Sequence, residues 1–180
     1  MPTMRTGFTA IAAATLLVGA TTAVAAQSDA STASPASSAV TGVEHLRAQV
    51  DLPAGAWTNT PVEVTLPRSG TYELDADVRG RLAGVPPINT YITARLWNVT
   101  SGTTVPTSER LVNQIIDNNA GNTQAGGNQT APISEVIRVK KATTIRLQAQ
   151  RIDAVGTATV GQVYSDVHGY TALRYKRVGS

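Results

Sequence analysis

The chain has 180 residues, of which 42% are hydrophobic and 15% are charged, so one domain with a packed core is expected. Its formal net charge is only +3 and its basic residues are spread along the chain, which excludes the clustered basic surface of a nucleic-acid-binding protein. It contains no cysteine, which excludes disulfides, thiolate metal sites and a cysteine nucleophile.

Residues 1–26 have the three parts of a secretory signal. Arg5 supplies the positive start, residues 10–20 form a short apolar stretch, and residues 23–26 are small, as a cleavage site requires. The apolar stretch is too short to span a bilayer, which needs about 20 residues. We therefore predict cleavage without transmembrane anchoring, and an extracellular protein; a short, alanine-rich signal is typical of bacteria.

Residues 27–43 are rich in Ser, Ala and Thr, with a single Pro. A segment of this composition cannot bury enough apolar surface to offset the entropy lost on ordering. We predict a flexible linker here, followed by a folded domain over residues 44–180.

The folded part shows alternating apolar and polar residues with frequent Gly and Pro turns, which predicts strands. About nine strands are expected: 45–52, 62–66, 70–82, 90–100, 108–117, 133–139, 143–152, 160–165 and 169–178. Turns at this spacing, with no helical crossover and no repeat, predict an all-β fold, namely an antiparallel sandwich or barrel.

Two of these segments show how the faces are used. In the strand 70–82, Tyr72, Leu74, Ala76 and Val78 share one face, and the charged residues share the other. The strand 90–100 is apolar on both faces, because Tyr91, Trp97 and Val99 alternate with Ile92, Ala94 and Leu96. One face is expected in the core, and the other either meets a neighbouring subunit or also fills the core.

Four segments carry a family resemblance: GTYELDADVRG, TYITARLWNVTSGTTVPTSE, VKKATTIRLQAQR and GYTALRYKRV. Together they resemble the globular heads of complement-type and tumour-necrosis-factor-like proteins. The matching positions are Gly70-Thr71-Tyr72, residues 142–151 and residues 169–178, and the resemblance covers roughly residues 44–179. It implies an antiparallel jelly-roll sandwich of nine to ten strands, a homotrimer, and binding through loops or subunit grooves without catalysis. The chain lacks the collagen-like stalk of such heads and is poor in aromatic residues.

The ligand-binding residues that we predict are aromatic and amide side chains. Trp57, Trp97 and Tyr91 are large aromatic residues that could stack on sugars or anchor a partner. Asn118 and Asn119 lie in the polar loop DNNAGNTQAGGN, where they could present amide groups. The same loop offers Asp117, Asn119 and Asn122 as oxygen ligands for calcium, although one carboxylate without EF-hand spacing favours a plain turn-rich loop and no metal.

Two clusters raise the alternative of catalysis. Ser165, Asp166 and His168 contain the residue types of a nucleophilic triad, but neighbours in sequence favour a turn with local backbone hydrogen bonds. Asp75 and Asp77 lie on one strand face about 7 Å apart, a separation that resembles inverting glycosidases. A solvated face with cross-strand partners is the favoured interpretation of this pair.

Three functions follow in order of preference. The first is a secreted, non-catalytic binding or structural module that trimerises, which would also stabilise a secreted domain lacking disulfides. The second is a monomeric carbohydrate-binding sandwich, and the third is a secreted hydrolase. No cofactor is implied, and the partner is a second copy, a glycan or a surface protein.

Overall fold

The computed structural model describes residues 39–180, so the predicted signal and residues 27–38 of the predicted linker lie outside the described residues. The described residues form eleven strands and no helix. No helix that could cross a membrane is found in this part of the chain. The strands are β1 (Thr41–His45), β2 (Val50–Asp51), β3 (Thr58–Leu66), β4 (Gly70–Gly84), β5 (Ile88–Asn98), β6 (Thr103–Thr104), β7 (Arg110–Asp117), β8 (Ala125–Val139), β9 (Thr143–Val155), β10 (Ala158–Val163) and β11 (Ala172–Gly179).

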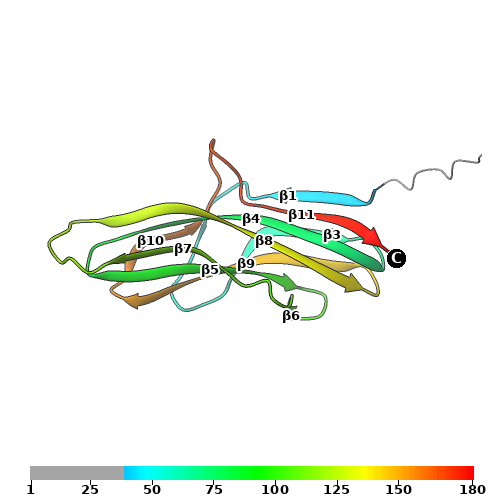
Figure 1. The fold of residues 1–180 in the computed structure, drawn as a ribbon, viewed down its shortest axis with the longest axis horizontal. Helices are drawn as coiled ribbons and strands as arrows, with labels where there is room; N and C mark the ends of the chain where they lie inside the picture. The colour runs from blue at the N-terminus through cyan, green and yellow to red at the C-terminus, as the bar shows by residue number, and fades with distance from the viewer. Residues whose placement is uncertain (1–38) are drawn as a thin grey trace, which may run out of the picture. The chain divides into compact units, whose positions relative to one another are not determined.

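The strands form two antiparallel sheets that pack face to face, as Figure 1 shows. In the first sheet, β4 pairs with β8 along one edge and with β11 and then β10 along the other. The outer neighbours of β11 and β10 are β1 and β2 respectively. In the second sheet the order is β3-β9-β5-β7, with the short β6 also paired to β5.

This strand order is that of a jelly roll. Each sheet is four strands wide once β1 with β2, and β10 with β11, are taken as two interrupted strands. From β3 onward the chain passes between the sheets at every connection except the hairpin β5-β6-β7 and the break between β10 and β11. Two such interleaved antiparallel sheets make the double Greek key of jelly-roll sandwiches. The predicted all-β jelly-roll fold is therefore confirmed.

The core lies between the two sheets and includes the apolar face predicted for the strand 70–82. Tyr72, Leu74, Ala76 and Val78 of β4 are at most 2% exposed. The second sheet contributes buried residues from its two central strands: Ile92, Ala94 and Leu96 of β5, and Ile145, Leu147 and Ala149 of β9. Burying each large aliphatic side chain contributes about 1.5–3 kcal/mol, so this interface is the main source of stability.

The structure differs from the predicted strands at the first strand. The segment predicted as one strand over residues 45–52 forms β1 and β2, and β1 begins at Thr41, within the predicted linker. The reason lies in the partners, because β1 pairs with β11 and β2 pairs with β10. Since β10 and β11 are separated by a loop, the strands beside them are interrupted at the same place.

The strand β8 begins eight residues earlier than predicted, at Ala125 rather than Ile133. Its first half is Gly-rich and polar and shows no apolar alternation. It is nevertheless paired residue by residue with β4, from Ala125 opposite Gly84 to Val139 opposite Gly70. Backbone pairing along a central strand extends β8 where its own side chains give no signal.

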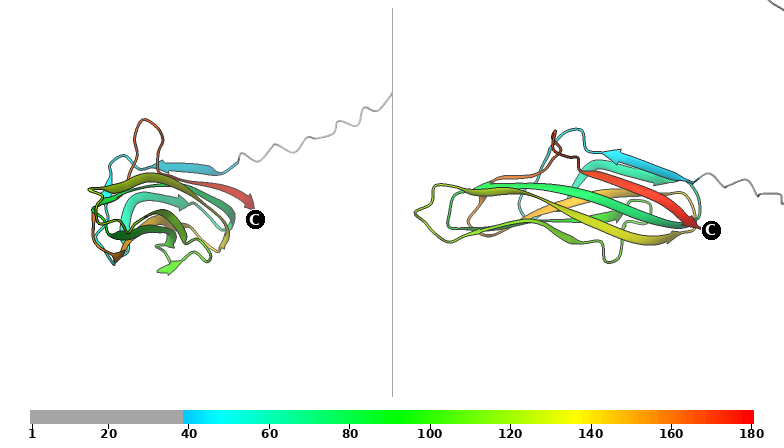
Figure 2. Two further views of the ribbon diagram at one scale, coloured as in Figure 1. Left: turned by 60° about the vertical axis from the view of Figure 1, so that its left-hand side comes forward. Right: turned by 45° about the horizontal axis from the view of Figure 1, so that its top comes forward.

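The connection between β10 and β11, residues 164–171, stands out from the first sheet, as Figure 2 shows. Val167 at its tip is 92% exposed, whereas Tyr164 and Thr171 at its ends are buried. The loop is therefore anchored at both ends on the outer side of the first sheet.

Candidate binding face

Trp57, Tyr91 and Trp97 lie on the outer face of the second sheet. Tyr91 and Trp97 alternate on β5 with the buried residues Ile92 and Leu96, and both are half-buried. Trp57 directly precedes β3 and is half-buried as well. The tryptophans are thus outside the core, and the structure decides against core filling by this side of β5. We call this surface, around Trp57, Tyr91, Arg95 and Trp97, the aromatic face.

Arg95 joins the two tryptophans. It occupies the outward position on β5 two residues before Trp97, and its guanidinium carbon lies 3.8 Å from the ring centroid of Trp57 and 5.0 Å from that of Trp97. A guanidinium at these distances is attracted by the negative face of an indole ring. Arg95 therefore holds together two aromatic residues that are far apart in the sequence.

A row of hydrogen-bonded side chains crosses the aromatic face. Arg95 Nε on β5 donates to Gln148 Oε1 on β9 at 2.9 Å, and Gln148 Nε2 donates to Asn59 Oδ1 on β3 at 2.8 Å. The next row holds Trp97 opposite Arg146, whose Nε donates to Glu63 Oε2 at 2.7 Å. The face is thus a rigid array of planar polar groups beside indole rings.

The charges of Arg95 and Arg146 are compensated differently. Arg146 forms an ion pair with Glu63, whereas Arg95 forms no ion pair with any described residue. Burial lowers the pKa of the Arg95 guanidinium, and the more distant Glu109 carboxylate opposes that shift. Arg95 is therefore a partly desolvated cation without a bound counter-charge.

The polar loop between β7 and β8 lies away from the two tryptophans. Asp117 at its start is paired with Ile88, nine residues before Trp97 along β5, which corresponds to about 30 Å along the strand. Asn118 and Asn119 are exposed there. The structure therefore brings Trp57 and Trp97 together but does not bring these two asparagines to them.

Within this loop, the oxygen atoms predicted for calcium accept hydrogen bonds from the loop itself. Asp117 accepts from the Asn119 backbone N–H at 2.9 Å and from Asn122 Nδ2 at 2.8 Å. These bonds lower the pKa of the Asp117 carboxyl. No cluster of three His, Cys, Asp or Glu side chains suited to a metal occurs in residues 39–180. These hydrogen bonds are those of a turn-rich loop, and the expectation of no metal, with calcium as the weaker alternative, stays a prediction.

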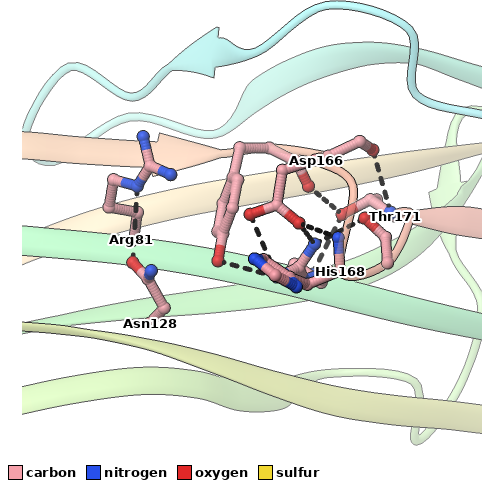
Figure 3. Close-up of polar contacts among 9 residues, drawn as sticks. Arg81, Asn128, Asp166, His168 and Thr171 are labelled. Atoms are coloured by element: carbon pink, nitrogen blue, oxygen red, sulfur yellow. Dashed lines mark hydrogen bonds and ion pairs between the residues drawn. The ribbon is translucent and has the colours of Figure 1, made fainter.

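The predicted triad residues belong to a different network, shown in Figure 3. Asp166 forms an ion pair with Arg79 of β4 and accepts the backbone N–H of His168 at 2.8 Å. The Ser165 hydroxyl accepts the backbone N–H of Thr171 at 3.0 Å. Among the described residues, Ser165 and the His168 ring share no hydrogen bond. These side chains shape a turn, as the local interpretation predicts.

Arg79 is the centre of that network. Its guanidinium also donates to the Gly169 carbonyl and, at 3.1 Å, to the Tyr164 hydroxyl, and it lies 4.6 Å from the Tyr164 ring centroid. The hydrogen bond from Arg79 holds the pKa of the Asp166 carboxyl below its usual range and, in turn, raises the pKa of Arg79. Arg79 thereby anchors the loop 164–171 to the first sheet.

Asp75 and Asp77 lie on the outer face of β4, each with its own partner. Asp77 forms an ion pair with Arg174 of β11 at 2.7 Å, and Asp75 accepts the hydroxyl of Ser134 on β8. Both partners come from neighbouring strands, as expected for a solvated charged face. The geometry does not point the two carboxylates at a shared pocket.

Sequence reasoning missed Arg95, Gln148 and Asn59. The strand alternation did contain a signal for Arg95, because an arginine two residues before Trp97 must share its face. No comparable signal existed for Asn59 or Gln148, since their meeting depends on the registers of β3 with β9 and of β9 with β5.

Comparisons with known proteins give only distant structural similarities. No family model and no curated protein matches the chain. Solved structures similar to it include the VP2 subviral particle of infectious bursal disease virus, with a TM-score of 0.48 and 15% identity over 78% of this chain. The Gx strain of the same virus gives a TM-score of 0.47 and 15% identity, also over 78% of this chain.

The chain spans about a third of the length of these viral proteins, namely 33% and 32%. Identity this low concerns the fold alone, so the jelly-roll class rests on the strand order described above. Neither structure is a complement-type or tumour-necrosis-factor-like head, and that finer part of the predicted resemblance stays a prediction.

Proposed function

We propose that the protein is a secreted, non-catalytic binding module that recognises a glycan through the aromatic face. The observation that carries this proposal is the placement of Trp57 and Trp97 outside the core, on one face of one sheet, with Arg95 between them. Secretion is supported by the signal-like pattern of residues 1–26.

The chemistry of the face fits a sugar. Indole rings combine a large apolar surface with a polar tip, which suits the apolar side of a sugar ring. The guanidinium of Arg95 and the exposed amide of Asn59 are planar groups that hydrogen-bond hydroxyls, and the buried Gln148 amide links the two. Their mutual hydrogen bonds fix their orientation before a ligand arrives, which reduces the entropy lost on binding.

The proposal of a non-catalytic role is supported by how the carboxylates are used. Asp77 and Asp166 are ion-paired with arginines, and the Ser165 hydroxyl is bonded to backbone. A general acid or base needs a carboxylate or imidazole that is free to exchange a proton with substrate.

Binding to soluble polysaccharides, measured by affinity electrophoresis and calorimetry, tests the proposal. We expect Trp57→Ala and Trp97→Ala each to weaken binding at least tenfold, since each removes a stacking surface. Tyr170→Ala is the matched control, because Tyr170 is 59% exposed but lies on the loop 164–171. Equal loss in the control, or full affinity in both tryptophan variants, would overturn the proposal.

A second candidate function is a homotrimeric structural or binding module of the tumour-necrosis-factor-like type. It is favoured by exposed apolar residues on the outer face of the second sheet: Leu111 at 54%, Ile116 at 60% and Val155 at 47%. Light scattering on the mature protein tests it. A mass three times that of the monomer, which falls to the monomer mass in Leu111→Lys, supports a trimer built on this face. A monodisperse monomer in the wild type would contradict this second candidate function.

A further inference from the structure

Arg95 has more hydrogen-bonding capacity than the protein uses. A guanidinium has five N–H donors in one plane. Within the described residues only the Nε–H of Arg95 has a hydrogen-bond partner, Gln148 Oε1, so the N–H groups of both terminal nitrogens are without one. Because the Trp57 indole covers a face of the guanidinium at 3.8 Å, the free donors lie along its edge.

The charge of Arg95 also has no counter-ion. Five other arginines of the described residues form ion pairs with carboxylates: Arg79, Arg110, Arg146, Arg151 and Arg174. Arg95 is half-buried against two indole rings and lacks such a partner. Buried charges are costly unless they are paired, so an anion bound here recovers part of that cost.

In the two rows of the aromatic face described above, Arg95 is the cation that lacks a carboxylate partner. The nearest basic group in the next row, Arg146, is already neutralised by Glu63. Glu109 influences the charge of Arg95 electrostatically but forms no ion pair with it among the described residues. The free edge of a guanidinium matches a carboxylate with two parallel hydrogen bonds, a geometry that a lysine cannot provide.

We propose that the ligand of the aromatic face is an acidic glycan, in which the carboxylate of a uronic acid binds the free edge of Arg95 while a sugar ring stacks on Trp57 or Trp97. The proposal rests on the glycan-binding function proposed above and names the class of sugar. A carboxylate offers two oxygens that accept two parallel hydrogen bonds from the guanidinium fork; a sulfate can accept the same pair, so the test below includes a sulfated polymer.

The test uses the mature protein and one polymer in two charge states. We expect polygalacturonate to bind at least tenfold more tightly than fully methyl-esterified pectin, which has the same backbone without the charge. We expect Arg95→Met to abolish this preference, so that the variant binds the acid no more tightly than the ester. Arg95→Lys keeps the charge but loses the fork, so it should recover only part of the preference.

Controls separate this proposal from general attraction between a basic protein and an acidic polymer. Arg81→Met removes an outward arginine of the first sheet and should leave the preference unchanged. Dextran sulfate bound more tightly than polygalacturonate would overturn the carboxylate assignment. An ester bound as tightly as the acid, with both tryptophans still required, would overturn this inference alone. Absence of binding to every polymer would overturn the proposed function with it.

Discussion

The two sheets each carry an outward arginine on a central strand, and the two arginines have opposite environments. Arg79 on β4 contacts the Asp166 carboxylate, the Gly169 carbonyl and the Tyr164 hydroxyl. Arg95 on β5 contacts two indole rings and one amide oxygen, and no carboxylate. An outward arginine thus has a carboxylate, a carbonyl and a hydroxyl as partners in the first sheet and has no charged partner in the second.

The difference distinguishes an arginine that stabilises the fold from one that is available to a ligand. The hydrogen bonds of Arg79 all go to the loop 164–171, so that side chain orders the protein itself. Arg95 keeps most of its donors free on a face that already holds Trp57 and Trp97. The unpaired N–H groups of Arg95 are not among the buried unsatisfied side-chain atoms of the described residues, so they are open to a ligand on this face. Three predictions test this comparison.

The largest effect is expected from Arg79→Ala. It should lower the free energy of unfolding by about 2 kcal/mol, because it removes several hydrogen bonds of a charged group that is only 12% exposed. Urea denaturation measures the change. Arg81→Ala is the matched control: Arg81 lies two residues along on the same face, stacks on the same Tyr164 ring and should cost less than about 0.5 kcal/mol. Equal effects in both variants would show that Arg79 has no special anchoring role.

A smaller change in the free energy of unfolding, or an increase, is expected from Arg95→Met. Replacing a desolvated, unpaired charge by an apolar chain of similar length should leave the free energy of unfolding within about 0.5 kcal/mol or raise it. The same denaturation experiment measures it. A loss above about 1 kcal/mol would mean that Arg95 stabilises the fold through its stacking, and the contrast with Arg79 would disappear.

The smallest effect is expected in the pH dependence of stability that Asp166 causes. The pKa of Asp166 is lower in the folded protein than in the unfolded chain, where it is about 3.9. Asp166 therefore contributes stability that is fully present above the unfolded pKa and is lost as pH falls through the folded pKa. We expect the difference in unfolding free energy between the wild type and Asp166→Asn to shrink as pH is lowered below about 4. A difference independent of pH would contradict the assigned ion pair.

The strand pattern predicted most of the fold, with failures where backbone pairing outweighs side-chain pattern. The core face of β4 follows from alternation, and its four predicted residues are buried, whereas the two apolar faces of β5 left open which of them lies in the core. The early start of β8 could not be predicted, because its first half is polar and owes its strand to pairing with β4. The break between β1 and β2 depends likewise on the break between their partners.

For the candidate site, the sequence identified the aromatic side chains but not the polar side chains that contact them. Trp57, Tyr91 and Trp97 stand out in a chain with few aromatic residues. Asn118 and Asn119 stood out as well, yet they lie at the far end of β5. Loop residues are placed by the strands that they connect, and a polar composition does not say which end of a sheet they occupy.

The sequence by itself determined which side chains share a face of a strand, and which face points inward where only one is apolar, because side chains alternate along a strand and the apolar set must leave water. Only the tertiary structure decided which outward side chains meet. Arg79 and Asp166 are 87 residues apart, and Arg95 and Gln148 are 53 apart. Their contacts depend on the order and register of strands in each sheet, which result from packing the whole sandwich.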